Sequence, residues 1–265
     1  MDLIAIDIGN STISMGVFAQ QQLQRTEQTA VQETDSQRLA NILAGFRELC
    51  GPQPLGARTV PVVVSSVNPP ALEIIEQAVQ DSLDQKILLI GREFPLEMKV
   101  AVENPETMGT DRLVTAFAAY QVVESAVAVA DFGTALTIDL VNDKGIFLGG
   151  VILPGLNTSA LSLKEHTTAL PLVKPEGPTG TYGINTVTAI QNGIYYGAIG
   201  ALREVVERYA EELGQWPQVV VTGGFSKMIA ENCDFIDSIV PHLCLNGLYL
   251  AYCRFRNSLE AGEQL

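Results

Sequence analysis

Asp7 follows an apolar run, Leu3 to Ile6, and precedes a turn that carries hydroxyl groups. The run is short and rich in branched side chains, which predicts a buried strand, and the alternation from Ile13 to Phe18 predicts a second one. Gly9-Asn10 between them predicts a hairpin turn, because both residues tolerate positive φ. N–H and O–H groups at such a turn bind phosphate oxygens, and a carboxylate beside them holds Mg²⁺ directly or through water. The hydroxyls belong to Ser11, Thr12 and Ser14. The alternative is an ordinary hairpin with an aspartate at its turn.

The stretch from Ala128 to Asp139 repeats this plan: an apolar strand, an aspartate, a glycine, a hydroxyl-bearing turn and an alternating strand. Asp131, Gly133 and Thr134 hold the corresponding places. Internal similarity at this separation predicts two related domains. Two such turns facing each other across a cleft would bind a polyphosphate from both sides.

The composition describes an acidic chain with enough apolar residues for a full core. Its formal net charge is −14 over 265 residues, of which 47% are hydrophobic. A surface this acidic disfavours nucleic acid, whose phosphates need lysine and arginine. It does not exclude ATP, because Mg²⁺ and turn N–H groups offset part of the triphosphate charge. The sequence shows neither a signal-peptide pattern nor an apolar run of about 18 residues, so no membrane association is expected.

The cysteines and histidines point away from metal and triad chemistry. Four cysteines without C-x-x-C spacing are interpreted as reduced thiols of a cytoplasmic protein. They are Cys50, Cys233, Cys244 and Cys253. Neither His166 nor His242 lies near a serine or cysteine nucleophile motif, so triad catalysis has little support.

Strand and helix patterns alternate after the first hairpin, which predicts an α/β fold with a mixed sheet. Further strands are expected at 21–25, 60–64, 86–90, 145–152 and 218–221. Helices are expected at 37–50, 71–83, 113–125, 156–164, 185–213 and 243–257. Residues 29–36 and 65–70 are expected to form a loop and a turn.

Asp111 and Arg112 lie near the first turn of the helix that joins the two halves. A carboxylate there can simply cap N–H groups and interact with the helix dipole. The functional alternative makes Asp111 a general base that accepts a hydroxyl proton from a substrate, with Arg112 holding a polar or anionic group of the same molecule.

Glycines mark two later segments. Gly193, Gly197 and Gly200 interrupt the long helical pattern, and several glycines on one helix indicate close packing, for example against a second subunit. Thr222-Gly223-Gly224 ends a predicted parallel strand, where a ligand can approach the backbone. The Pro- and Gly-rich residues 170–182 are expected to form a flap or an interface segment.

Six motifs in one order resemble type III pantothenate kinases, which belong to the actin, sugar kinase and Hsp70 superfamily. They are Asp7-Ile8-Gly9-Asn10-Ser11, Gly109-Thr110-Asp111-Arg112, Asp131-Phe132-Gly133-Thr134-Ala135, Gly149-Gly150 with Pro154-Gly155, Asn185-Thr186 and Thr222-Gly223-Gly224. Each motif alone is weak, whereas the ordered set is specific and covers residue 3 to about residue 250.

The resemblance implies two ribonuclease H-like domains of the actin-like ATPase fold, at 1–115 and 116–265, with mixed sheets flanked by helices. The segment from Asp7 to Ser14 would wrap the phosphates of MgATP, and Thr134 would also contact the nucleotide. That segment comprises Asp7, Ile8, Gly9, Asn10, Ser11, Thr12, Ile13 and Ser14. Asp131 would bind a monovalent cation, K⁺ or NH₄⁺.

The same resemblance assigns the acceptor site. Asp111 would accept the proton of the pantothenate hydroxyl, and the pocket would be lined by Gly109, Thr110 and Arg112. Thr186 would reach it, from the partner subunit of a homodimer whose active site lies near the interface. Val102 stands in this pocket where the family usually has tyrosine, so one contact to pantothenate is missing.

The predicted activity is ATP-dependent phosphorylation of pantothenate to 4′-phosphopantothenate, the first step of coenzyme A biosynthesis, in the cytoplasm. Phosphoryl transfer needs positioning and charge neutralisation more than covalent catalysis, which agrees with the absence of a Walker lysine motif. One alternative is a kinase of the same superfamily that acts on another small hydroxyl compound. Another is a non-catalytic transcription accessory factor, and a third is a phosphatase or polyphosphate hydrolase of the superfamily.

Overall fold

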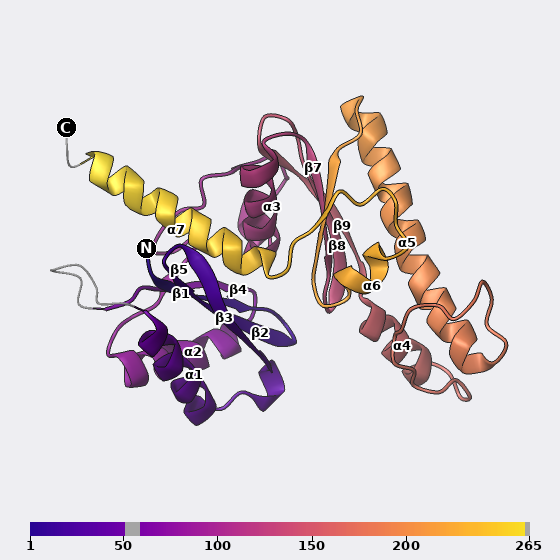
Figure 1. Ribbon diagram of the computed structural model, residues 1–265, viewed down its shortest axis with the longest axis horizontal. Helices are drawn as coiled ribbons and strands as arrows, with labels where there is room; N and C mark the ends of the chain where they lie inside the picture. The colour runs from indigo at the N-terminus through magenta and orange to yellow at the C-terminus, as the bar shows by residue number, and fades with distance from the viewer. Residues whose placement is uncertain (51–58, 263–265) are drawn as a thin grey trace. The chain divides into compact units, whose positions relative to one another are not determined.

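The computed structural model describes residues 1–50 and 59–262, and its chain divides into two compact units (Figure 1). Unit 1 comprises Met1–Glu97, Glu106–Ala118 and Leu243–Leu265, and unit 2 comprises Met98–Pro105 and Ala119–His242. The units are therefore not contiguous in sequence. The domain boundary predicted at residues 115 and 116 lies inside helix α3 (Thr110–Val123). The predicted division into two ribonuclease H-like domains at that point stays a prediction. The two units are defined by contacts within the structure, whereas the predicted domains are defined by their common ancestry.

Unit 1 is built on a five-stranded mixed sheet with the order β3-β2-β1-β4-β5. The strands are β1 (Leu3–Ile8), β2 (Thr12–Ala19), β3 (Gln22–Ala30), β4 (Val62–Ser66) and β5 (Leu88–Leu89). The first three form an antiparallel meander, and β4 and β5 continue the sheet in parallel from β1. The short helix η1 (Val31–Glu33) follows β3 in the chain, and the short helix η2 (Pro105–Thr107) precedes α3.

The two faces of this sheet carry different helices. Ile4, Ile6 and Ile8 of β1 are fully buried in a core with the apolar faces of α1 (Ser36–Leu49) and α2 (Pro69–Leu83), which lie side by side in Figure 1. Because side chains alternate along a strand, Leu3, Ala5 and Asp7 point to the opposite face. That face is covered by α7 (Leu243–Gly262), which contacts β1, β2 and β4.

Helix α7 packs closely on unit 1 although it is distant in sequence. The ring of Tyr249 stacks on Phe18 of β2 with 4.5 Å between centroids. One helical turn earlier, Leu245 lies over Gly16, where an added Cβ would come within 3.0 Å of the leucine side chain. Gly247 lies against the backbone carbonyl of Val114 in α3, at a distance that leaves no room for a side chain. The start of α7 is thus held between the sheet and α3.

Unit 2 is built on a six-stranded sheet with the order β11-β10-β7-β8-β9-β6. The strands are β6 (Lys99–Val100), β7 (Val127–Phe132), β8 (Ala135–Val141), β9 (Ile146–Pro154), β10 (Gln218–Thr222) and β11 (Ser238–Ile239). Its core joins one face of this sheet to α4 (Leu156–Glu165), α5 (Thr186–Leu213) and α6 (Ser226–Ala230). Figure 1 shows α5 running along the sheet.

The two sheets share one plan. An antiparallel meander, β1-β2-β3 or β7-β8-β9, is joined at its first strand by two parallel strands, β4 and β5 or β10 and β11. The two aspartate-bearing stretches thus occupy the same place in the two sheets, β1-β2 in one and β7-β8 in the other. The mixed α/β architecture is confirmed.

Several local predictions were wrong. The third strand, β3, extends to Ala30. Its polar residues resemble those of a loop, so its pairing with β2 over the last residues was not predicted. Ser65 and Ser66 belong to strand β4 instead of a turn. The strand expected at 86–90 is only Leu88–Leu89, and β6, α6 and β11 were too short for a pattern to reveal. The glycines do not break α5, which is a continuous helix of 28 residues with a capping box at Asn185.

The contact between Gly247 and Val114 generates a stability prediction. Gly247→Ala should lower the free energy of unfolding by about 1–3 kcal/mol, because the added methyl group must displace the backbone of α3. Chemical denaturation monitored by circular dichroism measures the change. Gly200→Ala is the matched control, since it makes the same helical replacement where nothing lies within 4 Å of the new Cβ. It should raise stability by up to about 1 kcal/mol. Equal effects of the two variants would contradict the close packing of α7.

Candidate functional site

Asp7 lies in a row of polar side chains across the sheet of unit 1. Its direct neighbours in register are Ser14 of β2 and Ser65 of β4. All three therefore point to the α7 face, where Ser65 is fully buried and Asp7 is partly buried. A carboxylate flanked by two hydroxyls supplies the oxygen ligands that Mg²⁺ prefers, and Mg²⁺ is usually held by one or two carboxylates together with substrate phosphates.

The turn after Asp7 is tight and tied to neighbouring elements. The N–H of Gly9 donates to the carbonyl of Thr12 at 3.0 Å, so the turn centres on Asn10 and Ser11, which are exposed. The side-chain amide of Asn68 donates to the carbonyls of Gly9 and Asn10 at 3.4 and 3.5 Å, while its oxygen caps α2. The predicted hairpin turn is present between β1 and β2, but neither Gly9 nor Asn10 adopts the positive φ that was expected of them.

The predicted nucleotide segment divides into side chains that can reach a ligand and side chains that cannot. Ile8 and Ile13 are fully buried in the unit 1 core and offer only backbone groups. Asn10 and Ser11 are exposed, and Thr12 and Ser14 are partly exposed. Ser14 Oγ also accepts a hydrogen bond from Gln28 at 3.1 Å. The polar atoms of the segment are thus gathered at the turn and on the α7 face.

Asp111 lies in the first turn of α3, and the preceding residues anchor that turn to β4. The hydroxyl of Thr110 lies 3.1 Å from Ser65 Oγ and donates to the carbonyl of Ser66 at 3.2 Å. A Cβ at Gly109 would lie 2.5 Å from Oδ1 of Asp111, so a side chain there would displace that carboxylate oxygen. The same Oδ1 accepts the backbone N–H of Arg112 at 2.8 Å. Asp111 therefore caps its own helix, and this contact leaves its other carboxylate oxygen for further chemistry.

Cys244, in the first turn of α7, lies near Asp7 and Thr115, and Asp111 is also close enough to act on it electrostatically. Burial raises the pKa of the Cys244 thiol well above its usual value, and the two carboxylates raise that pKa further. All four cysteines of the chain are free.

Unit 2 contains the counterpart of the Asp7 row. Asp131 of β7 pairs in register with Thr137 of β8 and Thr222 of β10. Thr222 is buried, and Gly223 follows it with a φ of +90°. A Cβ at Gly223 would overlap Oδ1 of Asp131, so only glycine leaves that carboxylate oxygen in place. Carboxylate, hydroxyl and backbone oxygens suit a monovalent cation, and the residues present fit one.

The turn that carries Thr134 is exposed at its tip and anchored at its base. The carbonyl of Thr134 accepts the hydroxyl of Thr158 at 2.6 Å and the N–H of Gly155 at 3.1 Å. Gly155 is the N-cap of α4, and a Cβ there would overlap the carbonyls of Gly133 and Thr134. The backbone of Thr134 thus lies beside the N-terminus of α4, and a helix N-terminus favours anions.

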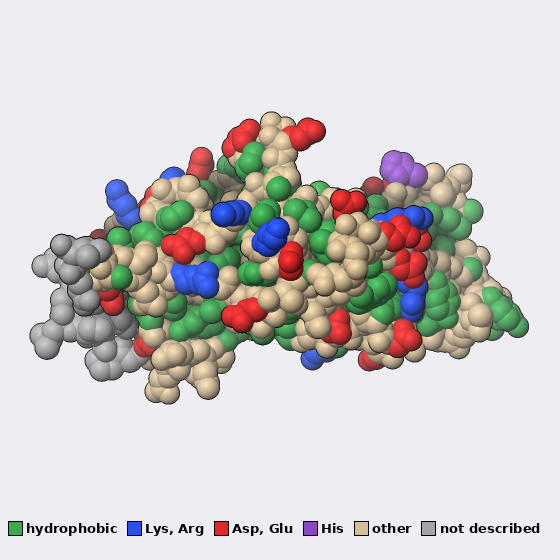
Figure 2. Space-filling model, turned by 90° about the horizontal axis from the view of Figure 1, so that it is seen from above, with side chains coloured by type: hydrophobic (Ala, Val, Ile, Leu, Met, Phe, Trp, Pro, Cys, Tyr) green, Lys and Arg blue, Asp and Glu red, His purple; other side chains and the backbone are tan. Residues whose placement is uncertain are grey.

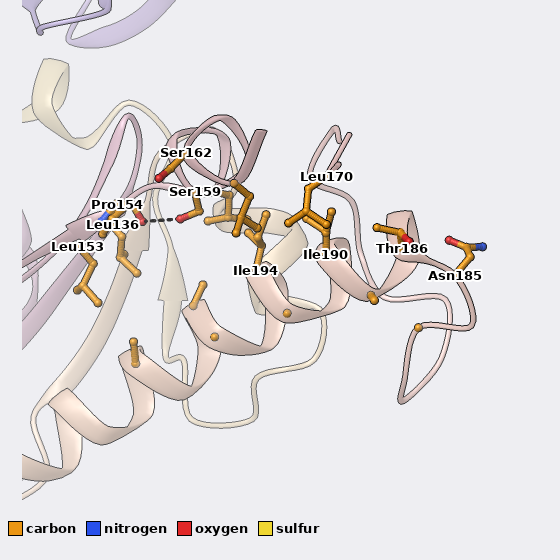
Figure 3. A pocket seen from close by; sticks show the side chains of 18 of the residues that line it. Leu136, Leu153, Pro154, Ser159, Ser162, Leu170, Asn185, Thr186, Ile190 and Ile194 are labelled. Carbon is orange, nitrogen blue, oxygen red and sulfur yellow. Dashed lines mark hydrogen bonds between the residues drawn. The ribbon is translucent and has the colours of Figure 1, made fainter. Parts of the chain in front are cut away.

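Thr186 and Val102 are placed elsewhere in unit 2. Thr186 begins α5 and lines an apolar groove of about 960 Å³ beside α4 (Figure 3). Leu170, Ile190 and Ile194 point into the middle of this groove in Figure 3, with Leu153 and Pro154 at the opposite end from Thr186. Val102 lies beside Gly149 of β9, 3.6 Å from the position of an added Cβ. The structure thus gathers Gly109, Thr110 and Arg112 at the start of α3, whereas Val102 and Thr186 lie on separate elements of unit 2.

The surface and the described side chains set further limits. On the face drawn in Figure 2, basic side chains stand among acidic ones and form no continuous basic stripe. Within residues 1–50 and 59–262, no group of three or more His, Cys, Asp or Glu side chains could hold a metal ion. None of the described helices is both long enough and apolar enough to cross a membrane.

Three side chains that lie beside the predicted site residues were not predicted from the sequence. Ser65 could have been found by extending the repeat, because it holds the same register place beside Asp7 that Thr222 holds beside Asp131. Asn68 follows a strand and precedes two prolines, which is an N-cap pattern, but its bonds to the turn are a tertiary feature. Nothing in the sequence indicates that Cys244 returns to Asp7 from the far end of the chain.

Comparisons with known proteins identify the family of the chain. The family model described as type III pantothenate kinase matches residues 3–208. A protein of Dehalococcoides mccartyi named type III pantothenate kinase is 36% identical over 251 residues, which cover 94% of this chain and 96% of the relative.

Two solved structures show the fold alone. A Campylobacter jejuni protein described as a Baf family transcriptional activator superposes with a TM-score of 0.60 at 18% identity, covering 96% of this chain and 100% of the other. Component A of the (R)-2-hydroxyglutaryl-CoA dehydratase of Acidaminococcus fermentans has a TM-score of 0.52 at 13% identity, covering 96% and 98%. Together with the two duplicated sheets, these neighbours establish the actin-like ATPase fold.

The tether between Thr110 and β4 generates a second stability prediction. Thr110→Ala removes the hydrogen bonds to Ser65 and Ser66 and should lower the free energy of unfolding by about 1–3 kcal/mol, because the partners are left partly buried. Thr110→Ser keeps the hydroxyl and should recover most of that loss. Urea denaturation of the three proteins measures both effects. A Thr110→Ala protein as stable as the parent would show that the tether contributes nothing.

Proposed function

The chain belongs to the type III pantothenate kinase family, and from that premise we propose that it transfers the γ-phosphoryl group of ATP to the hydroxyl of pantothenate. The product is 4′-phosphopantothenate, and the reaction is the first step of coenzyme A biosynthesis. The observation that carries the proposal is that Ser65, which flanks Asp7 in register, is hydrogen-bonded to Thr110, the residue before Asp111. One acid can serve the nucleotide while the other serves the acceptor.

The nucleotide is assigned to the two duplicated turns. Backbone N–H groups of the turn after Asp7, with the hydroxyls of Ser11, Thr12 and Ser14, bind phosphate oxygens. Asp7 holds Mg²⁺ directly or through water, and Thr134 contacts the nucleotide from its own turn. Asp131, with Thr137 and Thr222 beside it, holds the monovalent cation, K⁺ or NH₄⁺. When bound, both cations supply positive charge that offsets charge on the phosphates.

The acceptor is assigned to the start of α3. Asp111 accepts the proton of the pantothenate hydroxyl, as a general base within hydrogen-bond reach of that group. Arg112 holds a polar or anionic part of the same molecule, and Gly109 keeps the carboxylate accessible because it has no side chain. Thr110 lines the same pocket, and its hydroxyl, which is bonded to Ser65 and Ser66, also holds the first turn of α3 against β4.

The protein is proposed to be a cytoplasmic homodimer. The groove beside α5 is lined by apolar and small side chains, and added Cβ atoms at Gly193 and Gly197 would meet nothing within 4 Å. Ile184, which also lines the groove, is 85% exposed, and such exposure is unusual for a large apolar side chain. A second copy seated in this groove would cover these residues. Thr186 is assigned to the pantothenate site of the partner subunit.

ADP formation from ATP, measured with and without pantothenate in K⁺ and then in Na⁺, tests the activity. We expect turnover that depends on pantothenate and is faster in K⁺. Turnover with a different small hydroxyl compound from a substrate panel, and none with pantothenate, would favour the rival kinase. DNA binding without any ADP release would favour the accessory factor.

Asp111→Asn should lower kcat by about 10² or more in that assay, because the amide cannot accept the hydroxyl proton. Asp81→Asn is the matched control, since it makes the same replacement at an exposed position of α2 in unit 1. It should leave kcat unchanged. A near-normal kcat for Asp111→Asn would remove Asp111 from the mechanism.

Gly197→Leu should convert the dimer to a monomer, because the new side chain enters the groove, while nothing in the subunit lies within 4 Å to oppose it. Light scattering gives the molar mass. Gly200→Leu is the control, since it also meets open space on α5 but does not line the groove. A dimeric Gly197→Leu protein, or a monomeric parent, would contradict this interface.

A further inference from the structure

Asn68 lies between β4 and α2 and reaches back to the turn that follows Asp7. Its side-chain nitrogen donates to the carbonyl oxygens of Gly9 and Asn10 at 3.4 and 3.5 Å. Its side-chain oxygen accepts the N–H of Ala71 at 3.2 Å. An N–H group cannot donate to an amide nitrogen, so this capping bond determines which end of the amide faces α2 and which end faces the turn. The amide therefore joins the first turn of α2 to the turn between β1 and β2.

The main chain of Asn68 is held by its own neighbours. Its N–H donates to Ser66 Oγ at 3.2 Å, and its carbonyl accepts the N–H of Leu72 at 3.0 Å. The N–H of the preceding residue, Val67, donates to the carbonyl of Ile8 at 3.0 Å. The side-chain amide thus starts from a fixed backbone, which limits where its two N–H groups can point.

Helix α2 does not require an amide at this position. Pro69 and Pro70 follow Asn68 and have no N–H, so Ala71 provides the first N–H of the helix that needs a cap. Serine and aspartate cap a helix about as well as asparagine. The oxygen of the Asn68 amide meets this need by itself, and the NH₂ group is left to serve the turn.

The turn directs its carbonyl oxygens toward protein donors. The carbonyls of Gly9 and Asn10 face the Asn68 amide, and the carbonyl of Ser11 accepts the N–H of Val31 at 2.9 Å. The C=O and N–H of a trans peptide point in opposite directions. The N–H groups of Asn10 and Ser11 share their peptides with the first two carbonyls, so they point away from Asn68. Within the residues that the structure describes, no group accepts these two N–H groups.

This orientation suits an anion. Asn10 and Ser11 are exposed, and successive N–H groups of a turn make an anion-binding concavity. No lysine or arginine lies between Asp7 and Arg25 in the sequence, so in this segment the positive potential comes from N–H groups. Rotation of the peptide between Asn10 and Ser11 would exchange N–H for C=O, which is the difference between turn types I and II. A carbonyl in that place would repel a phosphate, and the bonds from Asn68 oppose the rotation.

We propose that Asn68 is a positioning residue for the nucleotide, whose amide holds the turn so that the N–H groups of Asn10 and Ser11 face the phosphates of ATP. The inference rests on the proposed function for the identity of the ligand. It adds a residue that contacts neither substrate and acts through the turn. A residue that only capped α2 would affect the stability of the protein and leave nucleotide binding unchanged.

Kinetics of variants separate the two roles of the amide. Asn68→Ser keeps an oxygen for the cap and removes the donor, so KM for ATP should rise about threefold to tenfold, the usual effect of one neutral hydrogen bond. KM for pantothenate should stay within about twofold of the parent. Asn68→Ala should raise KM for ATP equally, but it also loses the cap and should unfold at a lower urea concentration.

Asn41→Ser is the matched control, since it makes the same replacement at an exposed position of α1 in the same unit. It should match the parent in both KM values. An unchanged KM for ATP in Asn68→Ser, or a rise in KM that appears only in Asn68→Ala, would overturn the proposal.

Nuclear magnetic resonance of the ¹⁵N-labelled full chain tests the orientation without turnover. The amide signals of Asn10 and Ser11 should differ between the parent and Asn68→Ser before any nucleotide is added. Titration with MgADP should shift both signals in the parent and give a Kd about threefold to tenfold higher in Asn68→Ser.

The outcomes distinguish this inference from the proposed function. An unchanged Kd, or Asn10 and Ser11 signals that are the same in the two free proteins, would overturn the role of Asn68, whatever the acceptor. A weaker Kd and altered signals in Asn68→Ser, with no pantothenate-dependent turnover in the parent, would contradict the proposed function alone. A parent that binds no MgADP would overturn both.

Discussion

Strand register places the acids of this protein. In each sheet, the first strand of the meander carries an aspartate whose two cross-strand neighbours bear hydroxyls, Ser14 and Ser65 in one unit and Thr137 and Thr222 in the other. A shift of one residue in strand register would point each aspartate side chain into the apolar core. It would also point each buried isoleucine or phenylalanine side chain to the opposite face. The apolar face therefore determines where the polar row stands. The packing of apolar side chains on one face of each sheet therefore determines which polar side chains lie on the other face.

Two glycine residues lie at short distance from the carboxylates of Asp111 and Asp131. Gly109 lies against Asp111, and Gly223 lies against Asp131 in a conformation that favours glycine. At both positions a side chain would occupy the space of the carboxylate oxygen. The acids are therefore confined by main chain, which cannot change rotamer, and this confinement supplies the positioning on which phosphoryl transfer depends.

Local patterns predicted what depends on local sequence. The two aspartate-bearing hairpins, the long helices and the mixed α/β class were visible, because period, turn residues and caps are short-range features. The length of β3, the strand character of Ser65 and the continuity of α5 were not, because each is decided by a partner that lies elsewhere in the fold. The hydrogen bonds of Thr110 to β4 were not predicted either, because they join residues 45 and 44 positions apart in the chain. Nor could the sequence show that Cys244 of α7 comes near Asp7 of β1.

The return of α7 to unit 1 bears on how the chain is made. During synthesis the strands and the first two helices of this unit leave the ribosome early, and chains usually fold from the N-terminus as they emerge. Here the sheet face that carries Asp7 stays uncovered until residues 243–262 arrive. Unit 2 is translated in between and can acquire its own core first. Unit 1, whose first strands are made before unit 2, is thus the unit that is completed after it.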